Sequence, residues 1–187
     1  MNRSNDHIYI ERVLNGDLSS YTHLVNKYKN MAFTVALKVL RNVEDAEDTA
    51  QESFIKAYQQ LHSFKMKSKF STWLYTIVYR TAIYNARKNR INTEHINEDI
   101  TTRYEVPETD SLKAQDQQKH VKAAIDKLPK IEGLLISLFY INENTIAEIK
   151  TITGLSEANI KVKLFRARKN LKKELNTILQ HEINMLL

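Results

Sequence analysis

Glycine and proline are scarce in this chain, and their scarcity limits the folds that it can adopt. Only three Gly and two Pro occur in 187 residues. A sheet-rich fold needs turn residues about every 8–12 positions, which these few cannot supply. Apolar residues make up 42% of the chain, enough for packed cores. Over long stretches they recur at spacings of three and four, as on one face of a helix. The sequence therefore predicts an all-α protein.

The helical periodicity is interrupted once over a long stretch, in the polar and acidic residues 92–115. Before this stretch, periodic segments run over residues 8–40 with a break at Gly16–Asp17. A further helix is predicted to start at the N-cap Asn42. After a loop, another helix is predicted to start at a cap, Ser71 or Thr72, and to continue to about residue 89. The sequence predicts two small helical domains, residues 1–91 and 116–187. Residues 92–115 are predicted to form a linker without fixed structure between them.

Charge is unevenly distributed along the chain. Residues 64–90 contain seven Lys and Arg and no acid, and residues 117–187 carry a net charge of +5. Residues 91–116, between these two basic blocks, carry −5. Two separated basic blocks favour a polyanion that is contacted at two places.

Residue types and motifs of common enzymes are missing from the sequence. The chain has no Cys, which excludes disulfides, thiolate metal ligands and Cys nucleophiles. It contains no HExxH, no phosphate-binding Gly loop and no Gly-flanked Ser. No apolar stretch approaches the roughly 18 residues of a membrane span, and the first residues do not resemble a signal peptide. We therefore expect a cytoplasmic, soluble protein without enzymatic activity, metal or cofactor.

The sharpest local motif lies in the second half of the chain. Thr145 and Glu148 have the spacing of a capping box at the start of a short helix. Gly154 stands where a helix end needs a left-handed residue, and Ser156 can cap the helix that follows. Two helices joined by a short turn with Gly are typical of a helix-turn-helix.

The second helix of this motif would enter the major groove of DNA at its N-terminal end. Its expected DNA-binding residues are Ser156, Glu157, Asn159, Lys161, Lys163, Arg166 and Arg168. An ordinary helix pair with a solvated basic face is the alternative. Seven basic residues and no acid between Lys161 and Lys173 favour DNA, because helices normally place acids one turn from bases.

A second candidate surface combines aromatic and basic residues in the first half of the chain. On a helix, one strip would carry Trp73, Ile77, Arg80, Tyr84, Arg87 and Lys88, after a loop with Lys65, Lys67 and Lys69. Rings that stack on unpaired bases, beside charges that follow phosphates, are typical of single-strand binding. Burial of Phe70, Trp73, Tyr75 and Tyr79 in a core is the alternative.

A third feature is the acidic helix "EDAEDTAQESF". A metal or acid–base site is disfavoured, because the carboxylates lie on one helix face without an oxygen-rich loop or a nearby His. A solvated acidic face at a helix start is one reading. The other is a docking surface for a basic partner.

The order and spacing of these three features resemble the extracytoplasmic-function (ECF) group of bacterial sigma-70-family sigma factors. The matching passages are "EDAEDTAQESFIKAYQQLHSFKMKSKFSTWLYTI" and "AAIDKLPKIEGLLISLFYINENTIAEIKTITGLSEANIKVKLFRARKNL". The second passage is especially similar to members from Bacteroidetes. The resemblance implies a non-enzymatic subunit of RNA polymerase that recognises the −10 and −35 promoter elements and helps to melt DNA.

The resemblance also assigns surfaces. The contact surface for the β′ clamp helices of core polymerase would comprise Asp48, Gln51, Glu52, Phe54 and Tyr58. The loop 62–71 would capture a flipped base of the −10 element, and the helix 73–90 would follow the melted strand. The helix-turn-helix would read the −35 element and touch the polymerase β flap. An anti-sigma factor, often membrane-associated, would cover both domains and could hold the protein at the inner membrane.

Two departures from the family pattern stand out. Arg80 and Tyr84 occupy positions where the family more often has Asn and Asp, which puts the −10 preference in question. Gly133 stands where Arg is usual, and Gly inside a helix costs about 1 kcal/mol relative to Ala. Two alternatives remain open: a helix-turn-helix regulator that acts without being a polymerase subunit, and a helical adaptor that contacts no nucleic acid.

Overall fold

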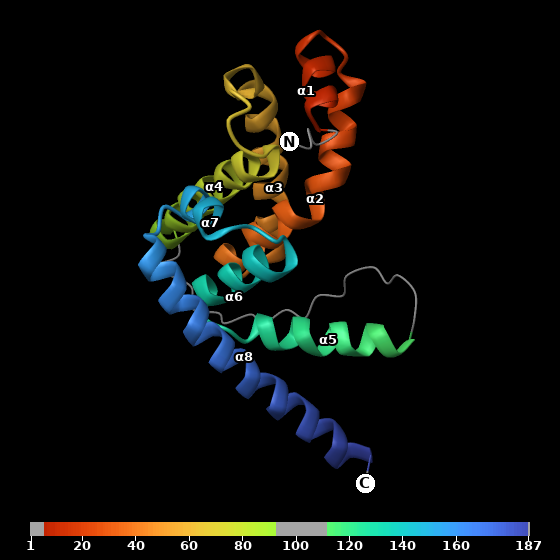
Figure 1. Ribbon diagram of the computed structural model, residues 1–187, viewed down its shortest axis with the longest axis vertical. Coiled ribbons are helices and arrows are strands. Elements are labelled where there is room, and N and C mark those ends of the chain that lie inside the picture. The colour runs from red at the N-terminus through yellow and green to blue at the C-terminus, as the bar shows by residue number, and fades with distance from the viewer. Residues whose placement is uncertain (1–5, 93–111, 187) are drawn as a thin grey trace. The chain divides into compact units, whose positions relative to one another are not determined.

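The computed structural model describes residues 6–92 and 112–186, and these residues form helices and no strand (Figure 1). The elements, in chain order, are α1 (Asp6–Leu14), α2 (Ser19–Leu40), α3 (Val43–Gln59), the 3₁₀ turn η1 (Leu61–Ser63), α4 (Phe70–Asn92), α5 (Leu112–Asp126), α6 (Lys130–Ile136), the π-helical turn η2 (Ser137–Ile141), α7 (Ile146–Thr153) and α8 (Glu157–Leu186). The predicted all-α fold class is confirmed. By their contacts the residues form two compact units, which we describe one at a time.

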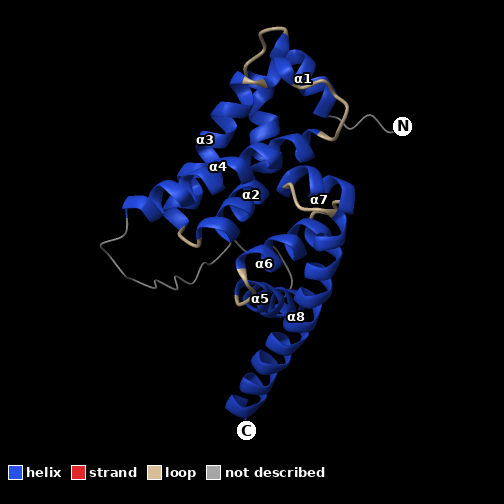
Figure 2. Cartoon of the chain, turned by 90° about the vertical axis from the view of Figure 1, so that its left-hand side faces the viewer, coloured by secondary structure: helices blue, strands red, loops and turns tan. Residues whose placement is uncertain are grey.

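Helices α2, α3 and α4 of the first unit pack against one another as a three-helix bundle, and α1 packs on α2 (Figure 2). The core of this unit is apolar, with Leu24, Val35, Leu74 and Val78 almost fully buried. The buried face of α3 consists largely of small residues, among them Ala46 and three others of similar size. Small side chains permit a close approach of the neighbouring helices.

The helix boundaries in this unit follow from local hydrogen bonds. The side chain of Asn42 accepts a hydrogen bond of 2.9 Å from the backbone N–H of Asp45, so the predicted cap is confirmed. Gly16 has φ +97°, and the carboxylate of Asp17 accepts hydrogen bonds from Ser19 and Ser20 at the start of α2. These bonds, with that of Ser19 the strongest, lower the pKa of Asp17 to about 2. The predicted start of α4 was wrong, because the helix already begins at Phe70, before the two proposed capping residues.

A buried carboxylate joins α1 to α2. Asp6 is almost inaccessible to solvent. Its side chain accepts a hydrogen bond of 2.7 Å from the hydroxyl of Tyr28 and pairs with Lys27 at 2.5 Å. Burial, followed by the bond to Asp6, raises the pKa of Tyr28 well above its ordinary value. Buried charges need such partners, and no pattern in the sequence indicated this one.

In the second unit, α5 and α6 pack on α8. The core is formed by side chains such as Leu128, Leu135, Ile160 and Leu164. The chain continues from α6 directly into η2, where the backbone N–H of Asn142 donates to the carbonyl of Ser137 at 3.1 Å. Residues 93–111, most of the predicted linker 92–115, lie outside the described residues. Helix α5 begins at Leu112, inside the predicted linker.

Candidate nucleic-acid interface

Helix α4 separates its aromatic residues into two sets. Phe70 and Tyr75 are buried in the core, so for these two the core interpretation holds. Tyr84 is 64% exposed. Trp73 is half-buried, with its ring 5.2 Å from that of Phe64 and 5.6 Å from that of Phe70. One face of Trp73 is thus held by the core while part of the ring remains accessible.

The basic residues near these rings are exposed to solvent. Arg80, Arg87 and Lys88 are exposed on α4, and Ile77 and Tyr79 are half-buried. The loop before α4 carries exposed Lys65, Lys67 and Lys69. We call Trp73, Ile77, Arg80, Tyr84, Arg87 and Lys88 the α4 strip. Its members share the accessibility that contact with nucleic acid requires.

The acidic helix α3 presents a mixed polar and apolar face. Asp48, Gln51 and Tyr58 are exposed on it. Phe54 is only 8% exposed, so its side chain lies in the core and offers little surface to a partner. Its neighbour Ile55 is 60% exposed and had not been predicted as a surface residue. We call Asp48, Gln51, Glu52, Ile55 and Tyr58 the α3 face.

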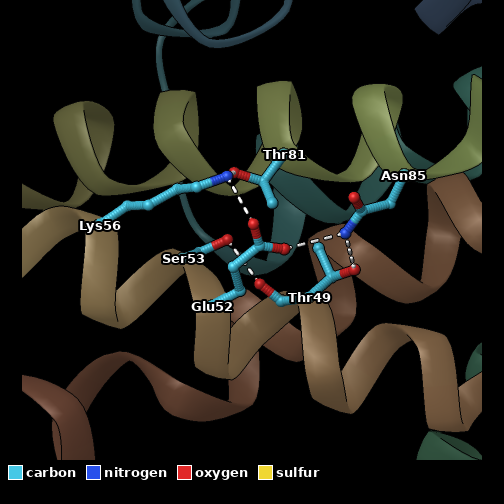
Figure 3. Close-up of polar contacts among 6 residues, drawn as sticks. All are labelled: Thr49, Glu52, Ser53, Lys56, Thr81 and Asn85. Carbon is cyan, nitrogen blue, oxygen red and sulfur yellow. Dashed lines mark hydrogen bonds and ion pairs between the residues drawn. The ribbon is translucent and has the colours of Figure 1, made fainter. Parts of the chain in front are cut away.

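Glu52 is held by polar contacts to α3 and α4 (Figure 3). One carboxylate oxygen pairs with Lys56 at 2.7 Å, and the other accepts a hydrogen bond of 3.1 Å from the amide of Asn85 on α4. The bond from Lys56, followed by that from Asn85, lowers the pKa of Glu52 below its ordinary value. A carboxylate that stays ionised in this position keeps both bonds at neutral pH.

The helix-turn-helix has the predicted local geometry. Thr145 and Glu148 form the capping box: the backbone N–H of Glu148 donates to the Thr145 hydroxyl at 3.2 Å, and that of Thr145 donates to the Glu148 carboxylate at 2.7 Å. Gly154 has φ +73°. The Ser156 hydroxyl accepts a hydrogen bond of 3.3 Å from the backbone N–H of Asn159. These contacts set the turn between α7 and α8.

The first half of α8 exposes both basic and apolar side chains. Ser156, Glu157, Asn159, Lys161 and Arg166 are exposed, and Lys163 is half-buried. Glu157 also pairs with Lys150 of α7 at 3.4 Å. Val162 and Phe165 are 50% and 68% exposed. Val162 and Phe165 were not predicted as surface residues, although their positions between the core residues Ile160, Leu164 and Ala167 indicate that they are exposed.

An apolar groove of about 490 Å³ runs along α8 within the second unit. Its lining residues are Val121, Ile125, Ile136, Tyr140, Ile141, Arg168, Leu171, Lys172, Leu175, Asn176 and Leu179. Arg168, predicted to bind DNA, is exposed but lines this groove, and its Nε donates to the carbonyl of Leu164 at 3.2 Å. The π-helical turn contributes Tyr140 and Ile141, both largely exposed.

In residues 6–92 and 112–186, no three His, Asp or Glu side chains are grouped so that they could hold a metal ion. No helix in these ranges is both long and apolar enough to cross a bilayer.

Comparison with known proteins identifies the family. Residues 24–91 match the model of sigma-70 region 2, and residues 119–171 match that of sigma-70 region 4. The ECF RNA polymerase sigma factor SigW of Bacillus subtilis is 32% identical over 180 residues, which cover 90% of this chain and 96% of SigW. The chain belongs to the ECF sigma factors of the sigma-70 family. The ECF sigma-E factor of Haemophilus influenzae is 30% identical, covering 93% of this chain and 97% of its own.

Solved structures share the fold of this ECF sigma factor. RpoE of Bartonella quintana, solved in complex with the anti-sigma factor NepR, aligns with a TM-score of 0.67 at 22% identity and covers 85% of this chain and 98% of its own. CnrH, solved with the cytosolic domain of CnrY, aligns with a TM-score of 0.63 at 20% identity and covers 92% and 97%. The ECF sigma factor described here is thus a transcription initiation factor with the helical fold of its family.

Proposed function

We propose that this ECF sigma factor binds core RNA polymerase through the α3 face, captures melted −10 DNA with the α4 strip, and reads the −35 element with α8. The observation that carries the proposal is the arrangement in the first unit. A helix with exposed carboxylates packs directly beside a helix whose exposed charges are all basic. Opposite charge on neighbouring helices suits two different partners, one basic and one a polyanion.

Core polymerase would contact the α3 face through both polar and apolar groups. Asp48 and Gln51 supply polar contacts, and exposed Ile55 and Tyr58 together supply apolar area. Interfaces of this kind combine an apolar centre with a charged rim that fixes orientation. The resemblance to the family identifies the partner surface as the β′ clamp helices. Ile55 takes the role that the sequence had suggested for Phe54.

Promoter melting would follow from selective capture. A protein that binds extruded bases more tightly than paired ones shifts the equilibrium towards open DNA. Trp73 offers an accessible ring on a fixed support, while Arg80, Arg87 and Lys88 lie along the same helix to contact phosphates. Arg80 and Tyr84 replace the more common Asn and Asp, so we expect stronger phosphate contact and weaker base discrimination at these positions.

The −35 element would be read from the exposed face of α8. Lys161 and Arg166 supply donors for guanine and phosphate oxygens, and Val162 and Phe165 supply apolar contacts for thymine methyl groups. Val162 and Phe165 are at least half exposed, so both side chains are accessible to such contacts. Arg168, on the groove side of α8, would contribute less to base contacts.

Removal of thymine methyl groups should weaken binding through Phe165. Replacing the thymines of the −35 element with deoxyuridine removes only the C5-methyl groups, and we expect a loss of affinity of about 3–10-fold for the holoenzyme. Phe165→Ala should lower affinity by a similar factor and abolish the response to deoxyuridine. Fluorescence anisotropy with both DNAs measures this. Ile8→Ala, at an exposed apolar position of α1, is the control, and an unchanged methyl response in Phe165→Ala would contradict the assignment.

The groove of the second unit would hold a further partner. Its apolar floor and the cations Arg168 and Lys172 at its edge suit an amphipathic helix with an acidic flank. The resemblance implies that the helix-turn-helix touches the polymerase β flap, and we propose this groove as the place of contact. RpoE of Bartonella quintana, which has the same fold, was solved with an anti-sigma factor, and we propose such a regulator for this chain as well. A sigma factor that meets polymerase on the chromosome would act in the cytoplasm, with the anti-sigma factor as its link to the membrane.

In domain terms, region 2 would comprise residues 1–91 and region 4 residues 116–187, with an acidic linker over residues 92–115. The matched ranges, 24–91 and 119–171, lie inside the two proposed domains. Since α5 begins at Leu112, its first turn belongs to the end of the linker in this division.

Reconstituted transcription tests the proposed function. The purified chain is added to core polymerase with a library of promoter fragments from its own genome, and initiation is mapped at the 5′ ends of the transcripts. We expect discrete start sites that depend on the added chain. Binding to palindromic duplex DNA without polymerase, and no start sites with it, would favour the alternative of a helix-turn-helix regulator.

A further inference from the structure

Asn85 occupies a central position on α4 that the proposed contacts with DNA do not use. Its neighbours Tyr84, Arg87 and Lys88 belong to the α4 strip, whereas the side chain of Asn85 points towards α3 (Figure 3). The amide nitrogen donates to the Thr49 hydroxyl at 3.0 Å and to the Glu52 carboxylate at 3.1 Å. Both N–H groups of this amide are thus used on the neighbouring helix.

The acceptors of these two bonds are themselves fixed. The second oxygen of Glu52 pairs with Lys56 at 2.7 Å, and the Lys56 amine reaches the Thr81 hydroxyl at 3.5 Å. Thr49 is buried, and its carbonyl accepts a hydrogen bond of 2.6 Å from Ser53. A partner held from several sides gives a bond that defines direction as well as distance.

A second amide repeats the pattern one turn along α4. Asn89 donates to the carboxylate of Asp45 at 2.9 Å. Asn is a poor helix former and gains little in a helix interior from propensity alone. Asn85 and Asn89 lie four residues apart, and each is bound to a carboxylate on α3. We infer that these two residues stabilise the first unit through their bonds between helices.

The bonds matter because of how α3 and α4 meet. The buried face of α3 is made mostly of small side chains, and the bonds from Asn85 and Asn89 join this helix to α4 in addition to the apolar packing. Because hydrogen bonds depend on direction, they favour one rotation of α4 about its axis. A rotation of α4 would displace the α4 strip relative to the α3 face, since each residue of a helix is turned by a fixed angle from the last.

We propose that Asn85 is a positioning residue, which holds the α4 strip in register with the α3 face so that a sigma factor docked on polymerase presents its strand-capturing side chains correctly. This inference rests on the proposed function. It extends that function because Glu52 belongs to the α3 face while its partner Asn85 sits among the residues of the α4 strip. One amide thereby links the two surfaces.

The test measures strand capture by holoenzyme assembled at saturating core polymerase, which removes any effect of the variants on docking. Asn85→Ala should lower the affinity for single-stranded −10 DNA about 3–10-fold, because both hydrogen bonds from Asn85 to α3 are lost. Its affinity for core polymerase should stay within about twofold of the wild type. Asn26→Ala, at an exposed position of α2, is the matched control and should change neither affinity.

Exchanging the donor and the acceptor tests whether the hydrogen bond between positions 85 and 52, rather than the identity of either residue, supports strand capture. Asn85→Asp places a second carboxylate against Glu52 and should weaken strand capture more than Asn85→Ala does. Adding Glu52→Gln to Asn85→Asp restores one donor and one acceptor across the same gap. We expect this double variant to recover most of the lost affinity, although it keeps the extra negative charge near DNA.

Two results would overturn the inference. One is strand capture within about twofold of the wild type in Asn85→Ala. The other is a double variant as weak as Asn85→Asp alone, which would assign the loss to charge near DNA. Circular dichroism at the assay temperature establishes that each variant is folded. If the wild type itself forms no promoter-specific holoenzyme, the proposed function fails; if it does and the swap does not rescue, only the role of Asn85 fails.

Discussion

Asp48→Lys should weaken the binding of this sigma factor to core polymerase by about 10–100-fold. The substitution removes an exposed carboxylate from the α3 face and places a cation against a partner surface that is expected to be basic. Like charges brought together at an interface cost several kcal/mol, and each 1.4 kcal/mol is a factor of about ten. Competition against the labelled wild-type chain for core polymerase, at fixed ionic strength, measures the change.

A charge reversal elsewhere in the first unit controls for net charge. Glu11 is exposed on α1, and Glu11→Lys changes the net charge by the same amount. We expect it to leave the affinity for core polymerase within about twofold, because exposed charges farther away than a Debye length of roughly 8–10 Å are largely screened. Equal losses in the two variants would show that overall charge governs the binding, and the α3 face would lose its assigned role.

Trp73→Ala should reduce the affinity of the holoenzyme for single-stranded −10 DNA by about 5–150-fold. This range corresponds to the roughly 1–3 kcal/mol that stacking on one base contributes. Duplex −10 DNA presents no free base to stack, so its affinity should fall much less. The preference for the single strand over the duplex is therefore the quantity to measure, by anisotropy with both DNAs.

The packing of Trp73 calls for a second variant. Its ring lies against Phe64 and Phe70, so Trp73→Ala also removes apolar contacts from the core. Trp73→Phe keeps a ring on the same support and should retain most of the preference. Thermal unfolding of both variants establishes the fraction folded at the assay temperature. A preference for the single strand that is unchanged in Trp73→Ala would count against stacking on this residue.

Helix boundaries were predictable wherever a short-range contact sets them. Asn42, the pair Thr145 and Glu148, and Ser156 each bond to a backbone or side-chain group three residues away, a spacing that is visible in the sequence. Gly154 likewise has the left-handed φ that its place at a helix end required. The start of α4 was placed too late, because apolar Phe70, which begins the helix, gives no capping signal.

The composition of the surfaces was less predictable. Phe54 and Ile55 are adjacent and both apolar, yet only Ile55 is exposed. The spacing of Phe54 from Ala46, Ala50 and Ala57 predicts a buried position, and it was the family resemblance that placed this residue on a contact surface. Tyr84 is exposed, as expected of a member of the α4 strip, whereas Tyr75 is buried. The roles of the exposed residues in binding stay predictions.

The helical fold class, the two basic blocks and the family could be predicted from the sequence, because periodicity, charge and motif order are properties of neighbouring residues. The accessibility of the individual rings, the place of Arg168 in a groove and the bond from Asn85 to Thr49, 36 residues away, became visible only in the folded chain. Such contacts depend on the packing of helices distant in the chain. Hydrogen bonds between helices carry no short-range signal that a linear pattern could reveal.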